Sequence, residues 1–213
     1  MIGSCLVVVT MVKLMGENGL VSLDLLTLQT QQERYFSMKK IQKPAEGEYI
    51  PYAVAYIKLV PEEGFLLQYL RDNVQKVKDL IQPLPEEKLI TPCEEGEWTI
   101  KEIMVHIIDT ERIFAYRALR IARNDSTPLP GFEQNEFVNH AGANQRNIED
   151  ILEELTLVRM ANIAMFNSFG DEVWERAGIA SGHKLTVRAA AYIIAGHEQH
   201  HIDSIKENYL SAM

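Results

Sequence analysis

The stretch AGHEQHHIDSIKENYL, residues 195–210, carries three of the chain's six histidines within little more than one helical turn. Its segment His197–His201 reads HEQHH and matches the pattern H-E-x-x-H. In metalloproteases this pattern places two zinc ligands one turn apart on a helix, with a glutamate, here Glu198, beside them as general base. The pattern therefore predicts a metal site, and a protease is the first hypothesis to test.

The sequence around these histidines does not suit a protease. Only twelve residues follow His201, and the extended metzincin pattern needs glycine at position 204 and histidine at position 207, where this chain has Ser204 and Glu207. The other large class takes a glutamate from a later helix, for which no chain remains. Such proteases also bind peptides along a sheet edge, and no stretch shows the alternation of a strand. We therefore expect a different kind of metal protein.

His197 and His201 fall on the inward face of a predicted helix. Spacings of three and four alternate along this face, as in the seam of a helical bundle, at Val187, Ala190, Ile194, His197, His201 and Ser204. A single inward histidine is most often a hydrogen-bonded core residue, but two of them one turn apart favour metal ligation. His200 lies about 100° around the helix from His201, so we expect it beside the site or at the surface.

Four stretches have helical periodicity, at approximately residues 61–84, 99–124, 147–169 and 186–209. Thr99 and Glu102 form the pattern of a capping box. Asn147 and Thr186 are good N-caps, and Gly170 suits a C-cap. No strand, internal repeat or low-complexity tract is expected. The sequence therefore predicts an all-α protein with a four-helix bundle.

The connections between these helices predict their directions. The stretch after the second helix, about residues 125–146, is more than twenty residues long, which is uncommon within a compact domain. At about 3.3 Å per residue it can run the length of a helix of ~35 Å, so that the third helix starts from the same end as the second. We therefore expect an up-down-down-up bundle.

A third metal ligand must come from upstream of His197. The candidates are His106, His140 and His183. His106 lies next to Ile107 on the apolar face of the second helix and can reach inward, whereas the other two lie in predicted loops, where a solvated histidine is ordinary. We therefore choose His106, which gives one histidine from the second helix and two from the fourth.

The segments GEWTIKEIMVHIIDTE, residues 96–111, and LTVRAAAYIIAGHEQHHIDSIKENYL, residues 185–210, resemble the DinB/YfiT-like superfamily. The resemblance covers about residues 46–210. It implies an up-down-down-up four-helix bundle that holds a divalent metal through three histidines, a pattern that falls on His106, His197 and His201. It thus agrees with the ligand set reached from the helix faces.

The resemblance also implies a choice of chemistries. Characterised members of the family include S-transferases and isomerases that use bacillithiol, mycothiol or glutathione, and many others are described only as metal-dependent hydrolases. An ion such as zinc, nickel or iron would lower the pKa of a water molecule or of a thiol. Our first hypothesis is a thiol-dependent S-transferase for small electrophiles, the second is a hydrolase of small molecules, and the third is a non-catalytic metal-binding bundle. Glu198 is the candidate catalytic residue, either as general base or as an acceptor for a ligand's N–H.

Composition limits the partners of the chain. The 213 residues are 46% hydrophobic and 24% charged, and the formal net charge is −9. This acidic balance disfavours nucleic acids, and no apolar stretch is long enough to span a membrane. The two cysteines, Cys5 and Cys93, are too few for a disulfide framework and indicate a reducing compartment. We expect a cytoplasmic protein with a small-molecule substrate, and the sequence leaves homodimerisation open.

The N-terminal stretch differs from the rest of the chain. An apolar segment, residues 4–12, precedes the stretch MKKIQKPAEGEYIPYAV, which begins at residue 38 and is typical of an ordinary protein start. We therefore divide the chain into an N-terminal extension, residues 1–45, and a bundle domain, residues 46–213. The extension is assigned no function.

Overall fold

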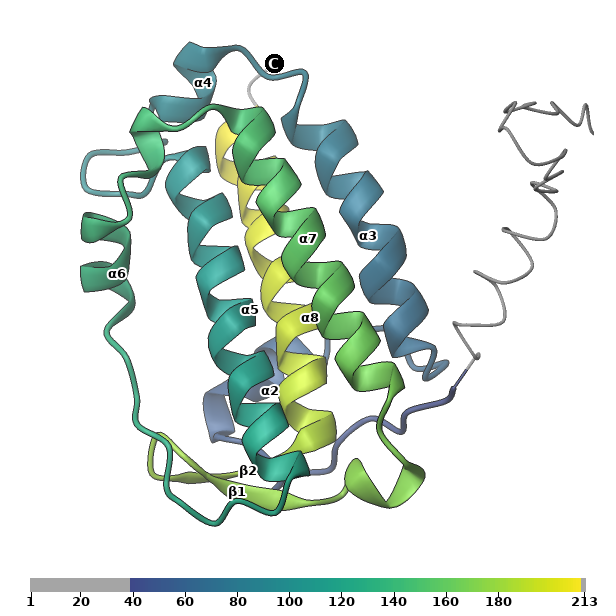
Figure 1. Cartoon of the computed structure of the whole chain (residues 1–213). Coiled ribbons are helices and arrows are strands. Elements are labelled where there is room, and N and C mark those ends of the chain that lie inside the picture. Colours follow the sequence, from purple (N-terminus) through teal and green to yellow (C-terminus); the bar gives the residue numbers. More distant parts are fainter. Residues whose placement is uncertain (1–38, 212–213) are drawn as a thin grey trace, which may run out of the picture. The chain divides into compact units, whose positions relative to one another are not determined.

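The computed structural model describes residues 39–211, most of which are helical (Figure 1). Four long helices form the bundle, and a turn of π-helix, Ile205–Leu210, continues the last of them. The bounds of the four are α3 (Leu66–Ile81), α5 (Ile100–Ala122), α7 (Ile148–Asn167) and α8 (Val187–Ser204). The predicted all-α four-helix bundle is confirmed.

The helices run up-down-down-up, as the connection lengths predicted (Figure 1). Lys101 at the start of α5 donates from Nζ to the carbonyl of Arg146, just before α7, at 2.6 Å, so these two helices start at the same end. Tyr209, beyond the end of α8, donates to the carbonyl of Trp98, just before α5. This contact makes α5 and α8 antiparallel.

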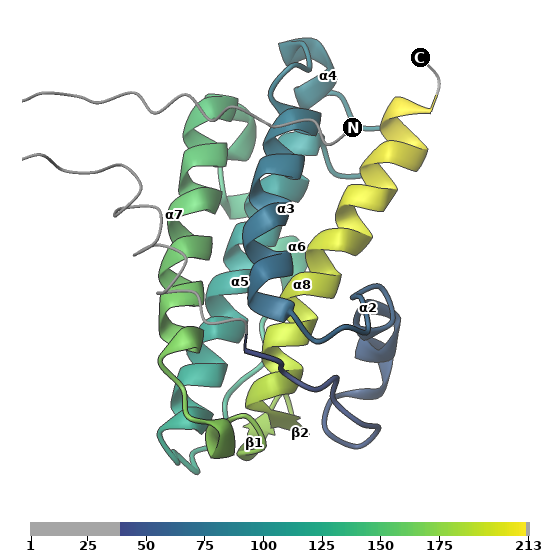
Figure 2. The ribbon, with the colours of Figure 1, turned by 90° about the vertical axis from the view of Figure 1, so that its right-hand side faces the viewer.

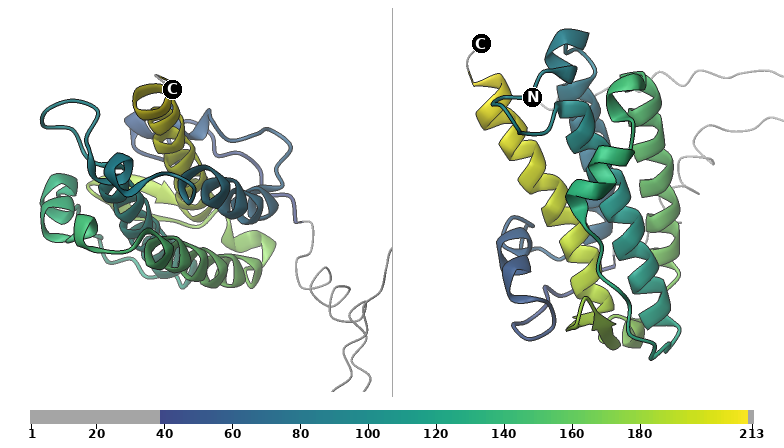
Figure 3. Two further views of the ribbon diagram at one scale, coloured as in Figure 1. Left: turned by 90° about the horizontal axis from the view of Figure 1, so that it is seen from above. Right: turned by 90° about the vertical axis from the view of Figure 1, so that its left-hand side faces the viewer.

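The long connection after α5 runs back along the outside of the bundle, beside α5 (Figures 1 and 3). It contains a short helix, α6 (Gln134–His140), and a 3₁₀ turn, Ala143–Gln145. Another short helix, α4 (Glu86–Ile90), lies in the connection between α3 and α5. Neither short helix was predicted, because five to seven residues are too few to show a helical period.

A two-stranded hairpin contradicts the prediction that the chain has no strand. The strands β1 (Ala177–Ala180) and β2 (His183–Thr186) pair antiparallel. Ser181 and Gly182 between them both have positive φ, 51° and 78°, which suits the two-residue turn of a hairpin. Strands of four residues are too short for an alternation to stand out. The hairpin lies at the end of the bundle where α8 begins (Figure 1).

The predicted caps have mixed outcomes. Thr99 and Glu102 make both hydrogen bonds of a capping box, and the hydroxyl of Thr186 accepts from the backbone N–H of Ala189. Asn147 occupies the N-cap of α7 without a side-chain cap bond. The Gly170 prediction is wrong, because its φ is −68° and Ser168 is the C-cap of α7, which ends at Asn167. The core contains apolar side chains spaced three or four residues apart on three of the helices, including Val77, Ile81, Ile103, Ile107, Ile151 and Leu155.

The segment before α3 packs on α8. Tyr192 of α8 donates its hydroxyl to the carbonyl of buried Ile41 at 2.7 Å, and Arg188 pairs with Glu48. The 3₁₀ turn Pro51–Ala53 and the short helix α2 (Val54–Ile57) follow and lie against α8 (Figure 2). Of the predicted extension, residues 1–38 lie outside the described residues. No described helix is long and apolar enough to cross a membrane.

Gly196 allows the backbone of α2 to approach α8. A Cβ atom at this position would lie 2.0 Å from the carbonyl oxygen of Tyr56, far inside van der Waals contact. Although alanine is the better helix former, we expect Gly196→Ala to lower the free energy of unfolding by about 1–3 kcal/mol through this overlap. Denaturant unfolding measures the change.

Gly131→Ala is the matched control. Its added Cβ would meet the Ser181 Oγ at 3.5 Å, an ordinary contact, so the effect should stay within about 0.5 kcal/mol. A Gly196→Ala protein as stable as the native chain would contradict the close approach of α2 to α8.

Candidate metal centre

His106, His197 and His201 meet in the interior of the bundle. His106 and His197 are 2% and 4% exposed, and His201 is partly buried. The Nε2 atom of His197 lies 2.9 Å from that of His106 and 3.1 Å from that of His201. Ligand atoms of the three residues lie within 4.8 Å of one another. The structure therefore brings together the three histidines selected from the sequence.

The geometry of these nitrogens fits a divalent ion. Two imidazole ligands on a tetrahedral ion are separated by about 3.3 Å, because each lies roughly 2.0 Å from it. The observed separations of 2.9 and 3.1 Å are close to this value. Hydrogen bonds among the three rings alone would satisfy these nitrogen atoms poorly, because each neutral imidazole has only one N–H donor and one acceptor nitrogen. The donor set suits zinc, nickel or iron.

The electrostatics of the cluster favours neutral imidazoles. Burial lowers the pKa of His106 to about 4. Burial and the neighbouring histidines lower the pKa of His201 to about 3, and they lower the pKa of His197 well below its ordinary value. At neutral pH all three side chains therefore keep a lone pair available for a cation.

Two aromatic rings hold the imidazoles in place. The ring of Trp98 lies 4.8 Å from that of His106 and 6.4 Å from that of His201. On the other side, the Tyr56 ring meets His197 edge-on at 5.4 Å. Trp98 thus forms one wall of the histidine cluster, and Tyr56 of α2 forms a second wall that the sequence did not predict.

The other histidines lie apart from the cluster. His200 is exposed, with its ring 5.4 Å from that of Tyr56, in agreement with the helical-face argument. His140 is exposed at the end of α6, and His183 is exposed on β2. The structure brings neither of these two into the cluster.

A cavity of about 750 Å³ adjoins the cluster at His201. It is bounded by the connection from α4 to α5, by the last turns of α8 with the following π-helical turn, and by Asn135 of α6. Its lining includes Cys93, Glu94, Glu97, Trp98, His200, His201, Ser204, Glu207, Asn208 and Tyr209. The volume suits a small molecule next to the histidines.

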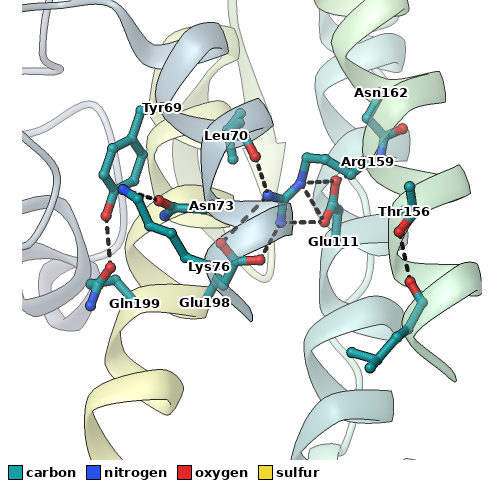
Figure 4. Close-up of polar contacts among 11 residues, drawn as sticks. Tyr69, Leu70, Asn73, Lys76, Glu111, Thr156, Arg159, Asn162, Glu198 and Gln199 are labelled. Carbon is teal, nitrogen blue, oxygen red and sulfur yellow. Dashed lines mark hydrogen bonds and ion pairs between the residues drawn. The ribbon is translucent and has the colours of Figure 1, made fainter. Parts of the chain in front are cut away.

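The carboxylate of Glu198 is bound to a buried arginine. Glu198 is 1% exposed, and its Oε2 accepts from Nη2 of Arg159 at 2.7 Å. The same guanidinium donates through Nε to both oxygens of Glu111 at 3.0 Å and through Nη1 to the carbonyl of Leu70 at 2.8 Å (Figure 4). Asn162 adds a donor to Glu111 at 3.1 Å. We call Glu111, Arg159 and Glu198 the buried charge cluster.

Comparison with known proteins identifies the family. The sequence profile described as the DinB superfamily matches residues 69–205, which is more than half of the chain and includes all three histidines. The chain belongs to the DinB superfamily. The family expected from the two histidine segments is therefore confirmed.

Relatives of this DinB-superfamily chain are described by metal dependence. A protein of Oceanobacillus iheyensis, named as a candidate metal-dependent hydrolase, is 22% identical over 142 residues, which are 66% of this chain and 81% of the relative. A protein of Bacillus licheniformis with the same description is 26% identical over 126 residues, which are 58% of this chain and 71% of the relative.

Solved structures share the fold of this DinB-superfamily chain. YfiT from Bacillus subtilis, described as a probable metal-dependent hydrolase with an unusual four-helix bundle topology, matches with a TM-score of 0.62 and 19% identity, over 76% of this chain and 92% of YfiT. A mycothiol-dependent maleylpyruvate isomerase matches with a TM-score of 0.51 and 12% identity, over 65% of this chain and 58% of the isomerase.

The buried charge cluster was missed in the sequence, although a signal for it exists. Arg159 is fully buried, and the positions four residues before and after it, Leu155 and Ile163, are also fully buried. A charged residue inside an apolar stripe requires a buried partner, but the helical period cannot say which acid on another helix supplies it. Burial alone would lower the pKa of Arg159, but the charges of Glu111 and Glu198 raise it.

Removal of the central cation should destabilise this DinB-superfamily bundle strongly. Arg159→Met leaves the carboxylates of Glu111 and Glu198 buried without their partner. We expect the free energy of unfolding to fall by about 3–5 kcal/mol, measured by chemical denaturation of the metal-free protein.

A variant with all three members replaced is the control. Arg159→Met combined with Glu111→Gln and Glu198→Gln removes both acids together with the cation and should recover part of the loss. If the single variant lost less than about 1 kcal/mol, the cluster would not have the structural role assigned to it.

Proposed function

We propose that this protein is a metal-dependent enzyme that transfers a low-molecular-weight thiol to a small electrophile. His106, His197 and His201 would hold one divalent ion, either zinc, nickel or iron. The observation that carries the proposal is the convergence of three buried Nε2 atoms beside a cavity of about 750 Å³. The descriptions of the relatives as metal-dependent support the metal, and the mycothiol dependence of the isomerase with the same fold supports the thiol.

The chain's own residues would orient the reactants and exclude water. A divalent ion held by three neutral imidazoles keeps its full positive charge and lowers the pKa of a thiol or of a water molecule. Trp98 and Tyr56 limit the space around the imidazoles, so that a molecule reaches them through the cavity. Asn135, Ser204 and Asn208 offer it hydrogen-bonding groups. The protein therefore needs no nucleophile of its own for thiol transfer.

Glu198 has a positioning role in this proposal. A general base must be free to take a proton from the reacting group, and the Glu198 carboxylate accepts hydrogen bonds from Arg159 on both oxygens, at 3.4 and 2.7 Å. It stands next to His197 in α8, so its ion pair with α7 fixes the rotation of the helix that bears two of the three histidines. The general-base role predicted from H-E-x-x-H is the competing hypothesis.

The second candidate function is a metal-dependent hydrolase of small molecules. It is favoured by the descriptions of the two sequence relatives and of YfiT, and the same three histidines would serve it. A non-catalytic metal-binding bundle is the third. A requirement for a thiol separates the first two, and absence of both activities from the metal-loaded protein would leave the third.

Metal binding tests the ligand set. We expect about one divalent ion per chain in protein purified without a histidine tag, because three neutral imidazoles can bind one ion and leave its fourth coordination position open. Replacement of His106, His197 or His201 by Ala should largely remove the ion, as measured by elemental analysis. His200→Ala is the matched control and should retain it, since His200 is exposed and outside the cluster.

The pH dependence of metal binding gives a second readout of the same prediction. The pKa values of His106 and His201, about 4 and 3, mean that protons compete weakly for the folded site, so occupancy at about pH 5.5 should match that at about pH 7.5. In the metal-free protein, these histidines bind protons at a higher pH in the unfolded chain than in the folded protein. The free energy of unfolding should therefore fall as the pH drops from about 6.5 to about 4. Loss of the metal with a midpoint near 6.5 would contradict the buried, neutral site.

The chemistry is tested with a model electrophile. The metal-loaded protein should consume a chloro-dinitroarene in the presence of bacillithiol, mycothiol or glutathione. Metal-free protein and His197→Ala should be inactive, because neither presents the ion to the thiol. Glu198→Gln should retain its metal and lose less than about tenfold in rate, whereas loss of a true general base costs roughly 10²-fold or more.

One outcome would favour the second candidate. Hydrolysis of esters or amides by the metal-loaded protein without any thiol, abolished by Glu198→Gln with the metal still bound, would identify a hydrolase with Glu198 as its base. Absence of the metal from the native protein would contradict both enzymes.

A further inference from the structure

The charge of the cavity beside the histidines narrows the class of molecule that can enter it. Three carboxylates line the cavity, from Glu94 and Glu97 in the connection before α5 and from Glu207 in the π-helical turn after α8. All three residues are exposed, so they face the solvent through which a ligand arrives. Among the described residues that line the cavity, none is lysine or arginine.

The remaining polar lining includes His200, His201, and amide and hydroxyl groups. Asn135 and Asn208 contribute amides and Ser204 contributes a hydroxyl, whereas the Tyr209 hydroxyl donates to the carbonyl of Trp98. Amides and hydroxyls match the hydroxyl groups of a ligand, whereas a ligand carboxylate would find no cationic side chain to pair with.

We infer that this cavity admits small, hydroxyl-rich molecules that are uncharged or positively charged, and disfavours molecules with free carboxylates. The inference deepens the proposed function. It rests on that function for the claim that the molecule in the cavity is a substrate. It ranks the three candidate thiols, since glutathione and bacillithiol carry free carboxylates and mycothiol carries none.

The expected size of the effect follows from the exposure of these carboxylates. Each lies in a largely aqueous environment, where one unit charge changes the local concentration of another by roughly 2- to 3-fold at contact distances. Three carboxylates at different distances from the molecule should therefore together favour a cation over an anion by about tenfold or more. The preference should weaken as ionic strength rises.

Cys93 provides a reporter inside the cavity. It is exposed and lines the cavity with the three carboxylates, and Cys5→Ser leaves it as the single cysteine of the chain. We would measure its modification rate in the metal-loaded protein with a matched pair of reagents, trimethylammonium-ethyl and sulfonato-ethyl methanethiosulfonate. In both, the thiolate attacks the sulfenyl sulfur, a mixed disulfide forms and methanesulfinate leaves.

For Cys93, we divide the rate of modification by the cationic reagent by the rate of modification by the anionic reagent. This cation-to-anion ratio should be about tenfold or more larger than the same ratio for mercaptoethanol, a neutral thiol in free solution. The ratio at Cys93 should fall at high salt. Glu94→Gln, Glu97→Gln and Glu207→Gln together should return the ratio to within about twofold of mercaptoethanol. The matched control, with Glu63, Glu149 and Glu153 changed to Gln, alters the net charge equally at exposed positions outside the cavity lining and should keep the high ratio. A native ratio equal to that of mercaptoethanol, or an equal fall in both triple variants, would overturn the inference.

Binding to the cobalt-loaded protein separates this inference from the proposed function. Mercaptoethylamine should bind more tightly than mercaptopropionate, by about tenfold or more, as followed by the cobalt absorption bands. If neither thiol changed the spectrum while the Cys93 ratio stayed high, the thiol chemistry would fail and the cavity inference would stand. Tighter binding of the carboxylate thiol would overturn the inference while leaving thiol transfer intact.

Discussion

One guanidinium group, that of Arg159, connects all four helices of the bundle. It extends from α7, pairs with Glu111 of α5 and Glu198 of α8, and donates to the Leu70 carbonyl of α3 (Figure 4). Because it is fully buried, each of these contacts replaces hydration that the charge has lost, so no partner can be removed without cost. Sliding or rotation of one helix would separate these partners and leave a charge buried without its pair.

The register of these helices matters because the three clustered histidines lie on two of them. Glu198 directly follows His197 in α8, and Glu111 lies five residues beyond His106 in α5. The ion pairs therefore fix the two helices that bring the Nε2 atoms of these histidines to 2.9 Å. Gly196 adds a steric condition from the other side, since it lets α2 approach and sets Tyr56 against His197.

The histidine cluster and the cavity provide two different environments. Burial lowers the pKa values of His106 and His201 and leaves lone pairs available on both rings. The cavity that adjoins the cluster at His201 is lined by polar groups, including three exposed carboxylates. The H-E-x-x-H pattern, which resembles a protease motif, here combines two histidines of the buried cluster with a glutamate that is paired with Arg159.

The sequence by itself determined the bundle, its direction and the three histidines, because each rests on a local regularity. Helical period, the Thr99 capping box and the length of the 125–146 connection predicted the fold, and the inward spacing of His197 and His201 predicted the cluster. Only the tertiary structure showed that Glu198 and Glu111 are the partners of Arg159. Only the tertiary structure placed Tyr56 against His197 and the carboxylates around the cavity. Each of these joins residues far apart in the chain, and a helical period shows which face of a helix is buried but not which residue of another helix it meets. The short hairpin Ala177–Thr186 was missed for a related reason, since strands of four residues are defined by their pairing rather than by a pattern of their own.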